Sequence, residues 1–241
     1  MGDRPVLEAF LAAASVDDAV FALRPDYRAM LVAAEGITPG PSDTATDALL
    51  QAAERAAKDA LARGPVERLP EVVSWREAYR SFGAKPQRTR NSLEALLRRA
   101  PSGLPRVNRL TDIYNAISVL RRIPVGGEDV ACCDGSPRLV RATGEEEFDT
   151  VADGRKAVEH PDPGEVVWRD RAGVTCRRWN WRQAQRTRLT ASTTAALFIL
   201  DALDPLDDEA LSAVVADLLE QLARLGPEVR AVHRTIRLGT P

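Results

Sequence analysis

Three short segments of the chain combine polar and aromatic residues in a way that suits ligand binding. They span residues 75–96, 108–129 and 176–193. In the third, Trp179 and Trp181 flank Asn180 among several arginines, a combination that amphipathic packing does not require. Aromatic rings next to guanidinium groups suit a nucleobase, a ribose phosphate or an aromatic aminoacyl group.

The usual signatures of enzyme chemistry are missing from the sequence. There is no glycine-rich nucleotide loop, nucleophile elbow, zinc-protease helix or kinase motif. Gly126-Gly127 is typical of a turn, and Cys132-Cys133, beside a predicted hairpin turn, favours a buried or incidental cysteine pair over a nucleophile. His160 and His233 have no partner in the sequence. We therefore expect neither a metal nor a cofactor.

Positive charge is concentrated in two regions of an otherwise acidic protein. The net charge is −2, yet residues 76–109 hold nine basic residues against two acids, and residues 169–188 hold seven arginines against one aspartate. Such clusters are expected of a surface that contacts phosphates. Solvated helix faces, or a general preference for arginine over lysine, would give the same pattern.

The elements that must position these segments alternate between helices and strands. Apolar spacing and breakers predict helices near residues 4–14, 43–64, 70–82, 92–100, 107–120 and 207–225. Strands are predicted at residues 21–23, 27–34, 138–143, 165–170, 174–177, 195–203 and 229–238. Because these elements form no repeating βαβ units, the pattern favours an α+β fold, with a mixed sheet and surrounding helices around one cleft.

The remaining composition narrows the class of protein. No apolar run approaches the roughly 20 residues that cross a bilayer, and the N-terminus lacks the features of a signal peptide. The odd number of cysteines and their spacing favour a reduced protein, so we expect a cytoplasmic location. We expect residues 1–69 to form an N-terminal extension that packs on the outside of a main domain over residues 70–241.

Several motifs, in their order along the chain, resemble the B3/B4 tRNA-editing domain of the phenylalanyl-tRNA synthetase β subunit. They are Asp112-Ile113-Tyr114-Asn115, Pro124 with Asp129, residues 138–145 and residues 166–170. Residues 75–79, 92–99 and 179–193 resemble stand-alone members of that family more than the synthetase. The resemblance covers about residues 70–203, with a weaker part near residues 21–37.

The resemblance implies hydrolysis of an ester that links a wrong amino acid to tRNA, by an ordered water and without a metal or a covalent nucleophile. Gly126 stands where the synthetase has a histidine, and no acid lies between Trp179 and Gln185 to bind a tyrosine hydroxyl. Specificity for tyrosine therefore does not carry over. Because these 241 residues leave no room for the aminoacylation core, we expect no ligase activity.

These considerations give a specific site hypothesis, with aminoacylated tRNA as the partner. Asn115 and Asn180 would orient the ester carbonyl and the water, and Glu128 or Asp129 would polarise that water. The predicted substrate-binding residues are Tyr114, Gly126, Gly127, Trp179, Trp181 and Gln183, and the predicted RNA-binding residues are Arg76, Arg98, Arg99, Arg178 and Arg182. A non-catalytic RNA-binding module, and a small-molecule or peptide-binding protein that kept the pocket, remain alternatives.

Overall fold

The computed structural model describes residues 4–152 and 154–240. It is an α+β fold, as the sequence predicts. The helices are α1 (Arg4–Ala12), α2 (Asp18–Phe21), α3 (Thr44–Leu61), α4 (Pro70–Ser81), α5 (Ser92–Arg99), α6 (Arg109–Arg121) and α7 (Asp208–Ala223), with short 3₁₀ turns η1 (Val66–Arg68), η2 (Ala100–Ser102) and η3 (Val130–Cys132). The strands are β1 (Ser15–Val16), β2 (Arg28–Glu35), β3 (Val125–Asp129), β4 (Arg138–Arg141), β5 (Phe148–Ala152), β6 (Arg155–Glu159), β7 (Val166–Arg169), β8 (Val174–Arg177), β9 (Arg182–Gln183), β10 (Ala196–Ala202) and β11 (Arg230–Arg237).

A four-stranded antiparallel sheet in the order β11-β2-β10-β3 lies at the centre of the molecule. Its two inner strands are almost entirely apolar, which is the pattern of strands that are covered on both faces. On β10, Leu197 and Ile199 point to one face, and Phe198 and Leu200 point to the other. The sheet therefore separates two hydrophobic cores.

A second sheet, in the order β1-β4-β7-β8-β9, covers one face of the central sheet. Its strands pair antiparallel, except for the parallel pair β1 and β4. Buried Trp168 and Trp179 from this layer share a core with Leu197 and Ile199 of β10. A hairpin of β5 and β6 lies beside it and contributes Phe148 to a smaller core.

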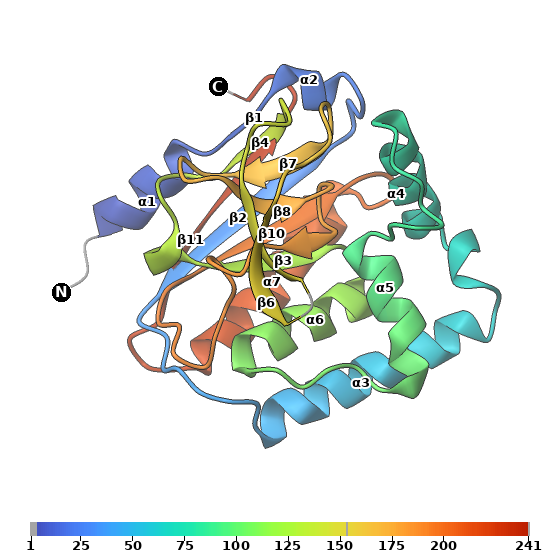
Figure 1. The fold of residues 1–241 in the computed structure, drawn as a ribbon. Helices are drawn as coiled ribbons and strands as arrows, with labels where there is room; N and C mark the ends of the chain where they lie inside the picture. Colours follow the sequence, from blue (N-terminus) through green and yellow to red (C-terminus); the bar gives the residue numbers. More distant parts are fainter. Residues whose placement is uncertain (1–3, 153, 241) are drawn as a thin grey trace.

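Helices cover the opposite face of the central sheet, with α6 and α7 packed against Phe198 and Leu200. Helix α3 lies along the outer side of α6, and α4 and α5 lie at the end of the layers near β3 (Figure 1). Side-chain caps fix the starts of the long helices: Asp43 accepts a hydrogen bond from the Thr46 amide, and Asn108 accepts one from the Thr111 amide. The caps therefore fix the residues at which α3 and α6 begin.

Most of the predicted helices are confirmed within a few residues, whereas three predictions about strands and turns are wrong. Phe21 ends a helix rather than starting a strand. Gly126-Gly127 lies inside strand β3 instead of forming a turn, and Asp134-Gly135 lies in a bend that joins no hairpin strands. The short β5–β6 hairpin was not predicted.

Part of the region that we expected on the outside of the main domain lies at its centre. Strand β2, from residues 28–35, is an inner strand between β10 and β11. Its side chains from Ala29 to Ala34 are buried. The division of the chain at residue 69 stays a prediction about folding units, but β2 shows that both parts share one sheet.

Two classes of feature are absent from the described residues. None of the helices built from residues 4–152 and 154–240 is long and apolar enough to cross a membrane. The same residues contain no group of three or more histidine, cysteine or acidic side chains placed to bind a metal ion.

Candidate active site

A cavity of about 230 Å³ lies where the two sheets meet α5 and α6. Strands β3 and β10 contribute one wall, β7 and β8 another, and the turn residues Trp179, Asn180 and Trp181 close it. Of the residues predicted to form a site, the cavity is lined by Tyr114, Asn115, Gly126, Glu128, Trp179, Asn180, Trp181, Arg182 and Gln183. The structure thus brings together side chains that are up to about 70 positions apart in the sequence.

The amide of Asn180 is held in one orientation by two buried partners. Its Oδ1 accepts a hydrogen bond from the Tyr79 hydroxyl at 3.0 Å, and its Nδ2 donates to Oδ2 of Asp201 at 3.3 Å. The Tyr27 hydroxyl donates to the other oxygen of Asp201 at 2.6 Å. Because an amide nitrogen carries two protons, this network leaves one N–H of Asn180 for a ligand.

Two buried carboxyl groups, Glu128 and Asp201, line the cavity. Burial raises the pKa of Glu128 to about 7, and Oε1 of Glu128 has no hydrogen-bond partner among the described residues. Burial also raises the pKa of Asp201 to about 7, although the hydrogen bonds from Tyr27 and Asn180 favour its charged form. Both groups therefore change protonation near neutral pH, where general acid–base chemistry is most effective.

Alternation along β3 decides which of its side chains face the cavity. Gly126 and Glu128 point toward the second sheet, and a Cβ atom on Gly126 would lie 3.5 Å from Nε2 of Gln183. Gly127 and Asp129 point the other way. Asp129 accepts a hydrogen bond from Thr193 Oγ1 at 2.6 Å and caps η3 through the Ala131 amide. Asp129 thus does not line the cavity, and neither does Gly127, whose carbonyl accepts a hydrogen bond from Gln183 at 2.6 Å.

Asn115 enters the cavity from α6. It is 8% exposed, and its amide makes no hydrogen bond within the described part of the chain. Its amide atoms are still reached by solvent through the cavity, so the missing protein partner leaves no fully buried polar atom unsatisfied. Tyr114, the preceding residue, lies against Phe198 with ring centroids 6.4 Å apart, and burial raises its pKa to about 12. Asn115 is thus a polar group available to a ligand, and Tyr114 is mainly a packing residue.

A strained turn between β8 and β9 positions the third sequence segment. Arg178 and Trp179 have φ angles of 48° and 67°, in the left-handed region that side chains other than glycine rarely adopt. The Trp179 amide donates to the Val166 carbonyl at 2.6 Å, and the Asn180 carbonyl accepts from the Ser92 amide at 3.1 Å. These bonds hold the turn against β7 and α5, and its strain is of the kind found at binding sites.

The two tryptophans of this turn have different surroundings. Trp179 is fully buried, and its ring makes edge contacts with Tyr27 and Trp75, with centroids 5.0 and 5.4 Å apart. Trp181 is half-buried, and the guanidinium groups of Arg178 and Arg182 lie 4.6 and 4.7 Å from its ring centroid. Trp179 therefore forms a rigid inner wall, whereas Trp181 forms a wall near the charged surface.

Most of the arginines predicted to bind RNA are paired with carboxylates, which the sequence analysis did not anticipate. Arg76 and Arg98 contact the fully buried Glu94 at 3.1 and 3.0 Å, and Arg98 also pairs with Glu67. Within the described part of the chain, the Arg99 side chain has a single hydrogen bond, to the Gly103 carbonyl at 3.4 Å. These side chains, apart from Arg99, are not the free cations that we expected, and their role in RNA binding stays a prediction.

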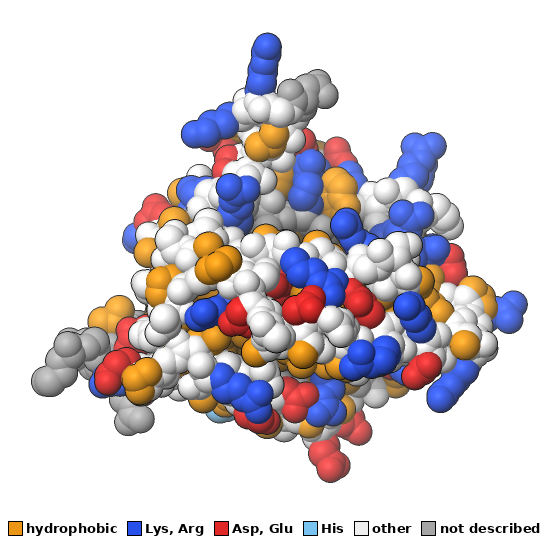
Figure 2. All heavy atoms as spheres, turned by 90° about the horizontal axis from the view of Figure 1, so that it is seen from below, with side chains coloured by type: hydrophobic (Ala, Val, Ile, Leu, Met, Phe, Trp, Pro, Cys, Tyr) orange, Lys and Arg blue, Asp and Glu red, His pale blue; other side chains and the backbone are white. Residues whose placement is uncertain are grey.

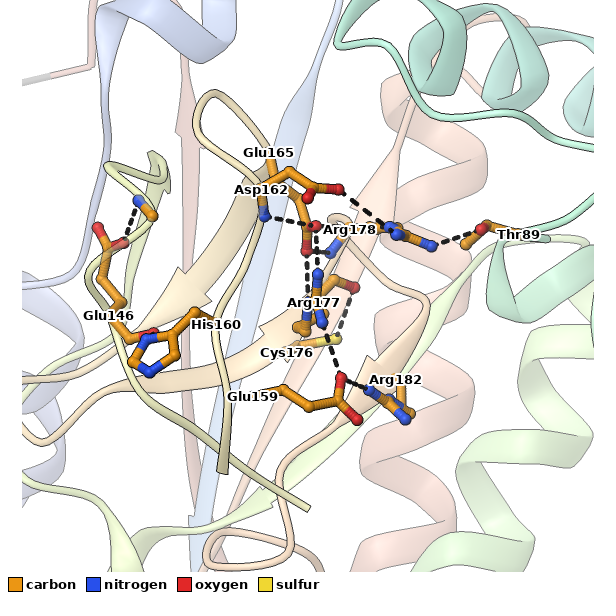
Figure 3. Close-up of polar contacts among 11 residues, drawn as sticks. Thr89, Glu146, Glu159, His160, Asp162, Glu165, Cys176, Arg177, Arg178 and Arg182 are labelled. Atoms are coloured by element: carbon orange, nitrogen blue, oxygen red, sulfur yellow. Dashed lines mark hydrogen bonds and ion pairs between the residues drawn. The ribbon is translucent and has the colours of Figure 1, made fainter. Parts of the chain in front are cut away.

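The pairing is densest beside the strained turn (Figure 3). Arg177 donates two hydrogen bonds to buried Glu165, at 2.9 and 2.7 Å. Arg178 lies between Glu165 and Thr89, and Arg182 pairs with Glu159. This cluster stabilises the turn that carries Trp179 and Asn180 into the cavity.

Sequence reasoning missed the residues that hold Asn180 in place. Asp201 is the single acid in the apolar strand β10, and that isolated charge was the available signal. Tyr79 lies in a segment that we singled out, but helical spacing alone does not show that its hydroxyl reaches Asn180, 101 positions away.

Comparisons with known proteins place the chain in a family. No curated protein matches the sequence. Among solved structures, an N-terminal fragment of the phenylalanyl-tRNA synthetase beta-subunit from Pyrococcus horikoshii is similar, with a TM-score of 0.45 and 12% identity. The match covers 90% of this chain and 49% of that fragment, so the chain spans about half of the fragment's length. The family model of the B3/4 domain matches residues 74–214, which is more than half of the chain, and the protein therefore belongs to the B3/4 domain family.

Proposed function

We propose that the protein hydrolyses the ester bond between an amino acid and tRNA. The observation that carries the proposal is the convergence, in one cavity, of two asparagine amides with hydrogen-bonding capacity to spare and a buried glutamate whose pKa is about 7. The resemblance of the sequence to a tRNA-editing domain, and the match to the B3/4 domain family, support this class of substrate.

In the proposed reaction, Glu128 acts as the general base. Its carboxylate accepts a proton from a water molecule, whose oxygen attacks the ester carbonyl. The bond between the carbonyl carbon and the ribose oxygen then breaks, and the proton passes to that ribose oxygen. A carboxyl group with a pKa near the working pH suits both transfers, because it accepts and returns a proton at similar cost.

The asparagines stabilise the charge that develops on the carbonyl oxygen. Asn180 donates its remaining N–H, and the fixed orientation of its amide means that little reorganisation is needed during the reaction. Asn115, whose amide has no protein partner, positions the carbonyl or the water. Trp179 forms the apolar wall against which the aminoacyl group lies.

The test is to incubate the protein with a panel of tRNAs, each charged with a correct or an incorrect amino acid, and to follow ester loss. Glu128→Gln and Asn180→Ala are compared with Gln51→Ala, which removes an amide from the exposed surface of α3. We expect turnover that both cavity variants abolish or slow and that the α3 variant retains. Absence of turnover with every charged tRNA would refute the proposal and favour a binding module.

A further inference from the structure

A second cavity, of about 330 Å³, lies on the other side of Arg178 from the candidate active site. It is bordered by the loop between α4 and α5, which supplies Lys85, Arg88 and Thr89, and by Asp162, Glu165 and Arg178. Arg178 lines this second cavity and also stacks on Trp181, which lines the first. One guanidinium group thus borders the second cavity and contacts a ring that borders the first.

The loop between α4 and α5 is positively charged. Its residues 82–91 contain Lys85, Arg88 and Arg90 and no acid. Lys85 and Arg88 are exposed, and neither forms an ion pair or a side-chain hydrogen bond with any residue that the structure describes. Their free charge distinguishes them from Arg76, Arg98 and Arg182, which are paired with carboxylates.

The charges around the second cavity leave an excess of positive charge. Arg177, Arg178 and Arg182 match the three carboxylates of Glu159, Asp162 and Glu165. Lys85 and Arg88 therefore add two uncompensated positive charges at its edge.

Hydrogen-bond donors in this cavity are also left over. Thr89, 4% exposed, accepts a hydrogen bond from Arg178 at 2.5 Å, so its own hydroxyl proton has no partner in the described part of the chain. The contacts of Arg178 with Asp162 and Glu165 are long, at 3.7 and 3.4 Å, and leave its N–H groups able to bind a further anion (Figure 3).

We propose that the second cavity binds a backbone phosphate of the RNA whose acylated end occupies the first cavity. This inference rests on the proposed function for the identity of the RNA. Lys85 and Arg88 neutralise the phosphate, and Arg178 and Thr89 donate hydrogen bonds to its oxygens. Because Arg178 also holds Trp181, binding of the phosphate and closure of the active-site wall involve the same guanidinium group.

The experiment measures equilibrium binding of uncharged tRNA over a series of salt concentrations, so that hydrolysis plays no part. The variant carries Lys85→Glu with Arg88→Glu, and its matched control carries Arg55→Glu with Lys58→Glu on α3, two exposed cations that also lack ion pairs among the described residues. Positive and negative side chains are interspersed on the face of the molecule seen from the side of α3 (Figure 2), so α3 offers no comparable positive surface.

We expect the loop variant to lower affinity roughly tenfold or more at low salt, and to make the slope of log affinity against log salt shallower by about 0.7 to 0.9 per lost contact. Asp162→Asn should raise affinity, because it removes a negative charge from the cavity. Equal affinity and slope for the loop variant and the α3 control would overturn the inference.

These outcomes are separable from those of the proposed function. Loss of binding in the loop variant, without hydrolysis by the wild type, would retain the phosphate site and refute the hydrolase. Hydrolysis by the wild type, with unchanged binding in the loop variant, would support the hydrolase and refute the phosphate site. All four substituted cations are exposed and unpaired, so thermal unfolding should be similar in the two double variants.

Discussion

Asn180 and Asp201 are joined by a hydrogen bond of 3.3 Å that lies beside the candidate active site and is otherwise enclosed by aromatic side chains. Asp201 also accepts the Tyr27 hydroxyl, and Tyr79 donates to Asn180. The chain of contacts from Tyr27 to Tyr79 therefore determines which atom of the amide faces a ligand. Asp201 positions Asn180 in this arrangement and need not contact the substrate.

Replacing Asn180 by alanine should slow ester hydrolysis on the order of a hundredfold, because it removes a donor to the developing oxyanion. Tyr79→Phe should slow it less, since it frees the amide to rotate but leaves the donor in place. Affinity for uncharged tRNA should change little in either variant. Single-turnover rates and binding constants measured on the same preparations would check this. Equal rates for wild type and Asn180→Ala would exclude Asn180 from catalysis.

The neighbours Glu128 and Asp129 should differ sharply in their effect on hydrolysis. Glu128→Gln removes the proposed base, and we expect a rate loss of about 10²–10⁴. Asp129→Asn alters a side chain on the opposite face of β3 and should retain most of the activity of the folded protein. The pH–rate profile of the wild type should rise through about pH 7, where Glu128 loses its proton. A profile without this rise would show that another group is the base.

The two raised pKa values also predict how stability depends on pH. Glu128 and Asp201 have pKa values of about 7 in the folded chain, against 4.5 and 3.8 for ordinary carboxyl groups, so the folded state binds these protons more tightly. Their stabilising contribution is complete at low pH and is lost as the pH rises through about 7. Thermal unfolding temperatures should therefore fall between pH 5 and pH 8. Glu128→Gln and Asp201→Asn should each make this decrease smaller. If the unfolding temperature of both variants fell with pH as steeply as that of the wild type, the raised pKa values would be contradicted.

Adjacent glycines of β3 offer a matched pair of substitutions. A Cβ atom at Gly127 would lie 2.5 Å from Leu189 and 3.0 Å from the Tyr114 ring, so Gly127→Ala should destabilise the protein by about 1–3 kcal/mol. At Gly126 the nearest atom would be 3.5 Å away, an ordinary contact. We expect Gly126→Ala to change the free energy of unfolding by less than about 1 kcal/mol. Urea unfolding of the two variants would measure the difference. Equal losses of stability would be inconsistent with side chains that alternate between the two faces of β3.

The buried pair of Arg177 and Glu165 should matter far more to stability than an exposed one. These side chains are 7% and 2% exposed, so Glu165→Gln removes the buried counter-ion of Arg177, leaves it only Glu159, which is 35% exposed, and should cost about 3 kcal/mol. The pair of Arg121 and Asp217 has similar geometry but is exposed, and Asp217→Asn should cost at most about 1 kcal/mol. Comparable losses in the free energy of unfolding of the two variants would show that burial does not determine how much an ion pair stabilises this protein.

Local signals in the sequence were sufficient to predict most of the helices. Caps such as Asp43 and breakers such as Gly64-Pro65 act over a few residues, so they can be recognised without knowledge of the fold. The meeting of Asn115 with Asn180 was expected from the family resemblance, because no local pattern links positions 65 residues apart.

Strand β3 shows where the sequence was insufficient. Two consecutive glycines favour a turn, and only pairing with β10 shows that they are extended. Without that pairing, the opposite orientations of Glu128 and Asp129 could not be derived. The charge of the arginine clusters is limited in a similar way: Glu67, a partner of Arg98, lies 31 positions away, so a count of charges along the chain overstates the free charge.

The position of β2 has a practical consequence for work on shortened versions of the protein. The segment that matches the family, residues 74–214, leaves out β2 and β11, yet β2 pairs with β10 along all seven residues of that strand. A fragment without β2 would expose the unpaired backbone and apolar side chains of Ala196–Ala202, which is a surface onto which strands of other molecules can add. Such a fragment should aggregate. Its inactivity would then result from the missing strand β2 and would say nothing about the chemistry of the cavity.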